Sequence, residues 1–162
     1  MDLFVLRHGE AGNRAKMISA DSKRTLTVAG RKEIEDVTEG ISHLKIKPDR
    51  IISSPMTRAR ETADILADSQ KMSRVEEWPE LNPEGSRQQL YDRLSTLRTD
   101  SSIVIVGHEP YLTSMICEII GAPSGQMALK KGGLARVHVN AFVPKVRGEL
   151  RWLLSPRLLK RL

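Results

Sequence analysis

Three short apolar runs in this chain each stop abruptly at a polar motif: residues 3–6 stop at 7–10, residues 51–52 at 53–58, and residues 103–106 at 107–110. A continuous apolar run is typical of a strand covered on both faces in a parallel sheet. The carboxyl ends of such strands lie side by side, and ligands bind just outside them. The pattern therefore predicts an α/β fold with one site at this edge, to which the motifs would bring Arg7, His8, Arg58 and His108.

The rest of the chain alternates between helical and extended patterns. In order, we expect a first strand up to residue 6, a loop over 11–24, a helix from Thr27 that Pro48 ends, strand 50–53, a helix after Pro55, strand 75–78, a helix from about 90 that ends near Thr99, strand 103–106, helix 111–120, and strands 134–142 and 148–154. Residues 134–142 alternate between apolar and polar, as in a half-exposed strand. We predict a three-layer α/β/α sandwich whose mainly parallel sheet has an antiparallel edge.

Length and composition bound the class of protein. With 162 residues the chain fits a single domain over 1–162. No window is long and apolar enough for a membrane span, and Met1 leads directly into the first strand. The single cysteine, Cys117, has no partner for a disulfide and is expected to be a buried core thiol. We expect a cytoplasmic monomer that does not bind a membrane.

The net charge of +6 indicates an anionic partner. Nucleic acid is disfavoured, because Lys and Arg are spread along the chain, aromatic residues make up only 4%, and no zinc-ligand spacing occurs. The basic and apolar tail 156–162 is too short for a stable amphipathic anchor. An anionic substrate explains the excess of positive charge equally well.

The motifs 7–10, 53–63 and 107–108 resemble the signature of the histidine phosphatase superfamily. Within it, the short length and the segments 21–27 and 152–156 are most similar to the SixA-like phosphohistidine phosphatases. The resemblance implies a phosphoglycerate mutase-like fold and a covalent phosphohistidine at His8 that water then hydrolyses. It also implies a phosphohistidine-bearing protein as substrate, inorganic phosphate as product, and no cofactor.

The residue types suit phosphoryl chemistry. The transition state spreads negative charge over the phosphoryl oxygens, and an arginine fork gives two parallel hydrogen bonds to them. We assign Arg7 and Arg58 to that role, with His108 as a third donor that is protonated when phosphate is bound. His8 is then left as the nucleophile, because an imidazole is substantially neutral near pH 7 and neighbouring cations lower its pKa further. Gly9 would let the backbone approach the phosphoryl group closely.

Other charged residues carry weaker signals. The resemblance puts Arg24 near the pocket mouth, where binding phosphate and forming a structural ion pair are equally good interpretations. Arg14 lies in an unpatterned loop. His43, His138, Arg31 and Arg60 are expected on solvated surfaces. No closely spaced His, Cys or carboxylate set completes a metal shell, so we expect no metal.

Two alternatives remain open. Relatives that cleave phosphate esters carry a carboxylic acid after the second motif to protonate the alkoxide, and Glu80 or Glu84 could supply one here. The chain would then act on small phosphate esters, nucleotides or polyphosphate. Neither glutamate has the flanking pattern of those relatives, and an imidazole leaving group needs such an acid less, which favours phosphohistidine. A non-catalytic module that binds an anion or nucleic acid is the second alternative.

Overall fold

The computed structural model describes residues 1–12 and 18–162 of the chain. Its sheet has the strand order β3-β2-β4-β1-β5-β6. The strands are β1 (Asp2–Arg7), β2 (Arg50–Ser53), β3 (Val75–Glu77), β4 (Ser102–Gly107), β5 (Leu134–Ala141) and β6 (Arg147–Leu154). The first four in that order pair in parallel, whereas β5 is antiparallel to both β1 and β6. The mainly parallel sheet with an antiparallel edge is thereby confirmed.

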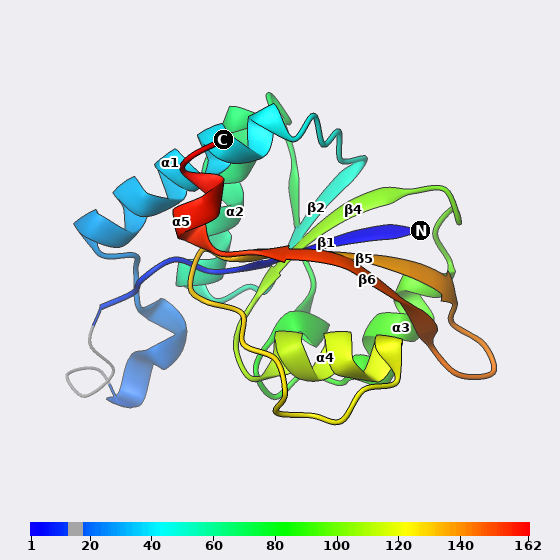
Figure 1. Cartoon of the computed structure of the whole chain (residues 1–162). Coiled ribbons are helices and arrows are strands. Elements are labelled where there is room, and N and C mark those ends of the chain that lie inside the picture. The colour runs from blue at the N-terminus through cyan, green and yellow to red at the C-terminus, as the bar shows by residue number, and fades with distance from the viewer. Residues whose placement is uncertain (13–17) are drawn as a thin grey trace.

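Helices cover both faces of this sheet (Figure 1). On one face lie α1 (Val28–His43), α2 (Thr57–Ser69) and the short α5 (Pro156–Leu159), and on the other lie α3 (Arg87–Ser95) and α4 (Tyr111–Ile120). Thr27 caps α1 as expected, since its hydroxyl accepts a hydrogen bond from the Gly30 amide. The predicted three-layer α/β/α sandwich is correct.

Strand β1 explains why the layers hold together. Its side chains point alternately to the two faces, so Leu3 and Val5 join the core under α3 and α4, while Phe4 and Leu6 join the core under α1 and α2. Leu3, Val5 and Leu6 are fully buried. A strand buried on both faces has to be apolar throughout, which is the pattern that the sequence carries. Burial on both sides holds the end of β1 in place.

Four local features differ from the sequence expectations. Helix α1 ends at His43, five residues before Pro48, with Leu44 as its cap and Lys45 at a positive φ of 54°. Residues 11–24 were expected to hold no regular element, yet η2, a 3-10 helix, spans Ile18–Lys23. Its polar composition hides it, because a short 3-10 turn has no apolar periodicity. Arg14 lies outside the described residues. Helix α3 ends at Ser95, four residues before Thr99, and β3 ends before Trp78, which is buried beside η3 (Pro79–Leu81).

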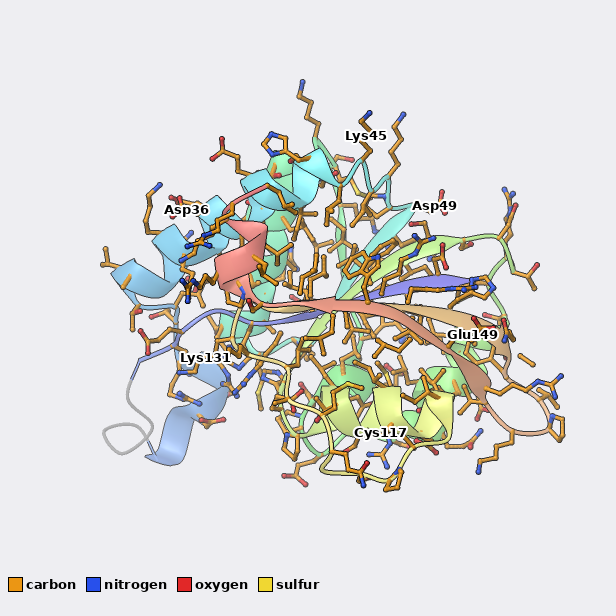
Figure 2. The ribbon with its side chains drawn as sticks, viewed as in Figure 1. Asp36, Lys45, Asp49, Cys117, Lys131 and Glu149 are labelled. Atoms are coloured by element: carbon orange, nitrogen blue, oxygen red, sulfur yellow. The ribbon has the colours of Figure 1, made fainter. Side chains whose placement is uncertain are left out.

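Cys117 lies on α4 (Figure 2) and is 1% exposed, which confirms the expected buried thiol. No helix among the described residues is long and apolar enough to cross a membrane.

Candidate active site

The ends of β1, β2 and β4 bring the three polar motifs together. In the register of the sheet, Arg7 lies opposite Gly107, and Ser53 lies opposite Val106 on the other side of β4. The residues that follow each strand therefore emerge at the same edge. His8 comes directly after β1 and His108 directly after β4, and their rings lie 5.0 Å apart between centroids.

His8 is held in one tautomer. It is 8% exposed, and its Nδ1 lies 2.6 Å from the carbonyl oxygen of Gly9. A carbonyl only accepts, so Nδ1 carries the proton and Nε2 keeps a lone pair. Arg58 donates to that Nε2 from its own Nε at 3.2 Å. Burial, with added repulsion from Arg58, Arg7 and Lys131, lowers the pKa of His8 to about 4, so the ring is neutral near pH 7.

Arg58 comes from the first turn of α2 and is only 4% exposed. Besides His8, its guanidinium donates to the backbone carbonyl of Asp21 at 2.9 Å and to the Asp21 carboxylate at 3.3 Å. Arg24 holds the other oxygen of that carboxylate at 2.7 Å and the Gly12 carbonyl at 2.8 Å. Burial raises the pKa of Asp21, but the hydrogen bond from Arg24 and the charge of Arg58 outweigh it, so the pKa lies below its ordinary value. An anionic group thus lies directly on the buried arginine.

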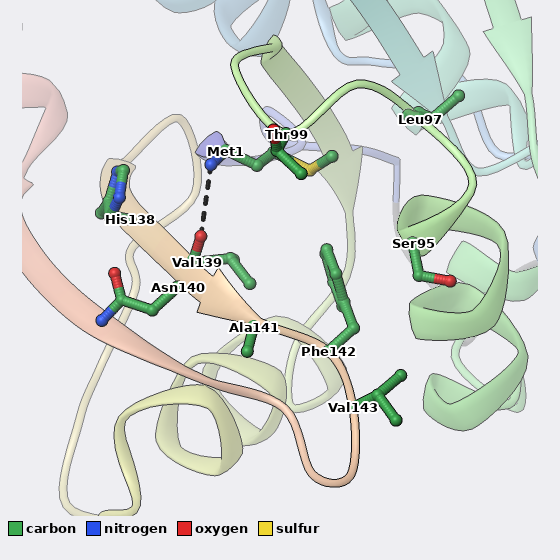
Figure 3. Close-up of a pocket in the computed structure, with 10 residues that line it drawn as sticks. All are labelled: Met1, Ser95, Leu97, Thr99, His138, Val139, Asn140, Ala141, Phe142 and Val143. Atoms are coloured by element: carbon green, nitrogen blue, oxygen red, sulfur yellow. Dashed lines mark hydrogen bonds between the residues drawn. The ribbon is translucent and has the colours of Figure 1, made fainter.

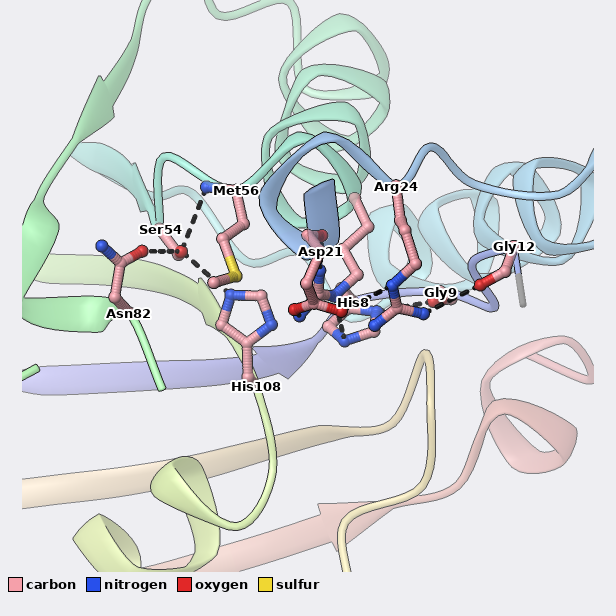
Figure 4. A network of polar contacts seen from close by, with 10 residues as sticks. His8, Gly9, Gly12, Asp21, Arg24, Ser54, Met56, Asn82 and His108 are labelled. Carbon is pink, nitrogen blue, oxygen red and sulfur yellow. Dashed lines mark hydrogen bonds and ion pairs between the residues drawn. The ribbon is translucent and has the colours of Figure 1, made fainter. Parts of the chain in front are cut away.

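His108 is the most buried of the four predicted residues, at 2% exposure. Its Nε2 lies 2.9 Å from the Ser54 hydroxyl, which donates to Oδ1 of Asn82 at 2.7 Å (Figure 4). Its Nδ1 has no hydrogen-bond partner among the described residues. Burial lowers the pKa of His108 to about 3, with smaller contributions from His8 and Arg58. This ring is therefore also neutral near pH 7.

Arg7 acts on His8 through its charge, and its own hydrogen bond goes to a backbone carbonyl elsewhere. It is half-buried and donates to the carbonyl oxygen of Leu129 at 2.9 Å. Its buried Nε has no partner among the described residues. The Leu129 carbonyl anchors the guanidinium near His8, whose pKa its charge helps to lower. Arg7 thus has hydrogen-bonding capacity left for an anion.

Gly9 is required for a different reason from the one expected. A Cβ at this position would lie 2.6 Å from Cγ1 of Ile34 and 3.2 Å from the Gly30 carbonyl, both on α1. The glycine therefore allows α1 to pack against the end of β1, and the crowding would be with the helix. The Gly9 amide donates to the Thr62 hydroxyl at 3.2 Å, which ties the first motif to α2.

The two glutamates considered as proton donors have different surroundings. Glu80 forms an ion pair with Arg93 at 3.2 Å, and the Arg93 guanidinium lies 3.9 Å from the ring centroid of Trp78. No hydrogen bond or ion pair of Glu84 is recorded among the described residues. Neither carboxylate has a recorded contact with His8 or His108.

The residues expected on solvated surfaces lie there. His43 is exposed, and His138 pairs with Asp2. Arg31 pairs with Glu61, and Arg60 pairs with Asp64 and Glu77. Within residues 1–12 and 18–162, no group of three or more His, Cys, Asp or Glu side chains could hold a metal ion.

Sequence reasoning missed three residues of the cluster, which are Asp21, Ser54 and Asn82. Ser54 stands inside the second motif, so its position carried a signal. Asp21 and Asn82 lie in loops whose path depends on tertiary packing. Asn82 follows η3, and only a glycine fits at the turn that closes this loop, since a Cβ at Gly85 would lie 2.1 Å from the Glu80 carbonyl oxygen.

Two buried neutral imidazoles beside the buried Arg58 and the half-buried Arg7, at the carboxyl edge of a parallel sheet, suit phosphoryl transfer. Comparison with known proteins agrees with this class. Residues 3–83 match the model of the histidine phosphatase superfamily, branch 1. The chain belongs to the histidine phosphatase superfamily.

Individual relatives show which members of the superfamily the chain is similar to. The chain is 32% identical over 131 residues to a phosphohistidine phosphatase SixA homolog of Haemophilus influenzae, covering 75% of this chain and 78% of the relative. It is 27% identical to the phosphohistidine phosphatase SixA of Escherichia coli, covering 99% and 97%. The solved structure of the protein histidine phosphatase SixA complexed with tungstate superposes with a TM-score of 0.85 at 26% identity, covering 97% of this chain and 98% of that one. The expected phosphoglycerate mutase-like fold and SixA-like family are confirmed.

Proposed function

We propose that this protein is a phosphohistidine phosphatase that works through a covalent phosphohistidine on His8. The observation that carries the proposal is the His8 tautomer. The Gly9 carbonyl holds the proton on Nδ1, so the lone pair on Nε2 is free to attack phosphorus as soon as Arg58 releases it. A neutral nucleophile with buried cations beside it suits an anionic electrophile.

In the first half of the reaction, Nε2 of His8 forms a bond to phosphorus as the bond from phosphorus to the substrate nitrogen breaks. The substrate reacts with its other ring nitrogen protonated, as an imidazolium, so the electron pair leaves with a neutral imidazole. Arg58 donates from its Nε to a phosphoryl oxygen once Nε2 no longer accepts that bond. Arg7 supplies further positive charge from its unpartnered Nε.

In the second half, water attacks the phosphoryl group on His8. The bond from phosphorus to Nε2 breaks, and the electron pair returns to the ring. The products are neutral His8 and inorganic phosphate, which leaves as dihydrogen phosphate because it keeps both protons of the water, so the cycle needs no cofactor or metal. Dialysis against EDTA is expected to leave activity unchanged, and an activity restored only by a divalent ion would contradict this mechanism.

Two observations support phosphohistidine as the substrate. Two relatives that match along most of the chain are named phosphohistidine phosphatases. In addition, Glu80 is engaged by Arg93, so the carboxylic acid that an alkoxide leaving group needs is not provided there. We further propose that the substrate histidine is presented by a partner protein.

The test compares specificity constants for a phosphohistidine peptide and for a panel of sugar phosphates, nucleotides and p-nitrophenyl phosphate. We expect a strong preference for the peptide, with Glu80→Gln and Glu84→Gln changing it little. A preference for a sugar phosphate that either substitution abolishes would instead establish an ester phosphatase. No turnover of any substrate would favour the binding module, for which DNA binding at increasing salt is the direct assay.

Arg24 stays a candidate for substrate binding, because it forms an ion pair with the same carboxylate, Asp21, as Arg58 does. The single domain, the monomeric state, the cytoplasmic location and the lack of nucleic-acid or membrane binding also stay predictions.

A further inference from the structure

His8 and His108 are held in opposite tautomers. The carbonyl oxygen of Gly9 keeps a proton on Nδ1 of His8. At His108 the partner is a hydroxyl, which can donate or accept, so the tautomer depends on where that hydroxyl proton goes. The Ser54 hydroxyl donates to the Asn82 carbonyl oxygen at 2.7 Å. Its proton is therefore committed, and it can only accept from Nε2 of His108.

The backbone fixes both members of this chain of hydrogen bonds. The Ser54 amide donates to the Val106 carbonyl at 2.9 Å, which continues the β2–β4 ladder. The Asn82 amide donates to the Pro79 carbonyl at 3.0 Å. Ser54 is fully buried. The Ser54 hydroxyl also accepts from the Met56 amide at 3.3 Å, at the start of α2. A substitution of Asn82 leaves that contact in place and therefore tests the path through His108 more directly than a substitution of Ser54.

We propose that Ser54 and Asn82 are positioning residues that keep the His108 proton on Nε2, so that Nδ1 meets the phosphoryl group and takes up one proton when that group binds. Nδ1 is buried and has no partner among the described residues. Figure 4 shows this second ring nitrogen on the side of His8 and Asp21. A lone pair there repels a phosphoryl oxygen, whereas an N–H donates to it.

The proton balance is simple. In the empty site His108 is neutral, with one proton on Nε2. When an oxyanion binds, one proton from solvent adds to Nδ1, the ring becomes an imidazolium, and both of its N–H groups have an acceptor. The Ser54 hydroxyl stabilises the charged ring, because it accepts a hydrogen bond from Nε2. His8, Arg58, Asp21 and Arg24 are the charged or titratable groups that act on this ring, and only Asp21 favours its protonation.

This inference rests on the proposed function, because it assumes that a phosphoryl group binds beside His8. The experiment uses tungstate as a non-reactive oxyanion and the full chain labelled with ¹⁵N-histidine. In the free protein, we expect ¹⁵N shifts of His108 that report a proton on Nε2 and a lone pair on Nδ1. With tungstate bound, both nitrogens should be protonated, and calorimetry in buffers of different ionisation enthalpy should report uptake of one proton.

Two variants act in opposite directions, and a third is the control. Ser54→Ala removes the acceptor of Nε2, so tungstate affinity should fall about ten-fold and its alkaline limit should move to lower pH. Asn82→Asp puts a negative charge behind Ser54, so the alkaline limit should move up by about one pH unit. Ser53→Ala is the matched control, since that buried hydroxyl donates to a backbone carbonyl and not to a ring.

The outcomes separate the two proposals. A proton on Nδ1 of His108 in the free protein, or equal pH profiles for Asn82→Asp and Ser53→Ala, would overturn the role of Ser54 and Asn82. Failure of the parent protein to bind tungstate would instead count against the proposed phosphatase, while the tautomer in the free protein still decides the positioning role.

Discussion

The two ends of the sheet differ in what fills them. At the amino end of β1 and β4 lies a hollow of about 460 Å³, lined by residues that include Met1, Leu97, His138 and Phe142 (Figure 3). At the carboxyl end, His8, Arg58 and His108 are 8%, 4% and 2% exposed, and the Asp21 carboxylate lies on Arg58. None of the four predicted site residues lines the hollow at the amino end, whereas His8, Arg58 and His108 are packed against one another at the carboxyl end.

This difference shows that a candidate active site is better identified by its buried, chemically reactive side chains than by the volume of a cavity. Burying two imidazoles beside a guanidinium is costly, and the pKa values of both imidazoles are lowered as a result. The Asp21 carboxylate already accepts a hydrogen bond from Arg58, and a bound oxyanion would have to share or replace it. Five predictions test the contrast, from the largest expected effect to the smallest.

His8→Ala should remove the nucleophile and lower turnover to below about one thousandth of the parent. Rapid quench with labelled substrate should trap an acid-labile, base-stable phosphoenzyme in the parent and none in the variant. His43→Ala, which changes an exposed histidine, is the matched control. If the His8→Ala variant still retained the label, the nucleophile would be a residue other than His8.

Arg58→Lys replaces a fork with a point charge, so activity and vanadate affinity should both fall by about 100-fold. The control is Arg60→Lys, two residues along the same helix, whose partners Asp64 and Glu77 lie on the surface. If both variants behaved alike, Arg58 would have no special role in holding the oxyanion.

Stability should fall as the pH drops from about 7 towards 4. Unfolded histidines take up protons near their ordinary pKa of 6.5, but folded His8 resists until about 4 and His108 until about 3. The unfolded state therefore binds more protons in this window, and the free energy of unfolding decreases with falling pH. Urea unfolding at a series of pH values should give a flatter dependence for the His8→Ala, His108→Ala double variant, and an unchanged slope would contradict the displaced pKa values.

Asp21→Asn should tighten tungstate binding by about five-fold, because it removes the anion that competes for Arg58. Asp36→Asn, which makes the same charge change on the outer side of α1 (Figure 2), should leave the affinity unchanged. Weaker binding in the Asp21 variant would mean that this carboxylate positions Arg58 and Arg24 for the oxyanion and does not compete with it.

The smallest effect is expected at the amino end of the sheet. Ala141→Phe should fill part of the hollow, and the specificity constant should stay within about two-fold of the parent. Fluorescence-monitored unfolding would verify that the variant is folded. A large loss of activity from this position would break the contrast between the two ends.

The sequence carried much of the fold and of the reacting set. Continuous apolar runs identify β1 and β4 because a strand covered on both faces cannot carry polar side chains. The signals at Thr27 and Gly121 mark the start of α1 and the end of α4. The motifs after the strands contained Arg7, His8, Arg58 and His108, because parallel strands bring their carboxyl ends to one edge. The 3-10 helix η2 escaped notice since a single polar turn has no periodicity.

What the tertiary structure alone decided is the set of partners around those residues. No local pattern predicts that Asp21 reaches Arg58, that Asn82 orients Ser54 under His108, or that Gly9 makes room for Ile34. Each of these contacts joins residues at least 25 positions apart, and each depends on how distant segments pack at the edge of the sheet. Local sequence determines strands, caps and residue chemistry through short-range sterics, whereas tautomers, displaced pKa values and competing anions follow from burial and distance, which exist only once the chain has folded.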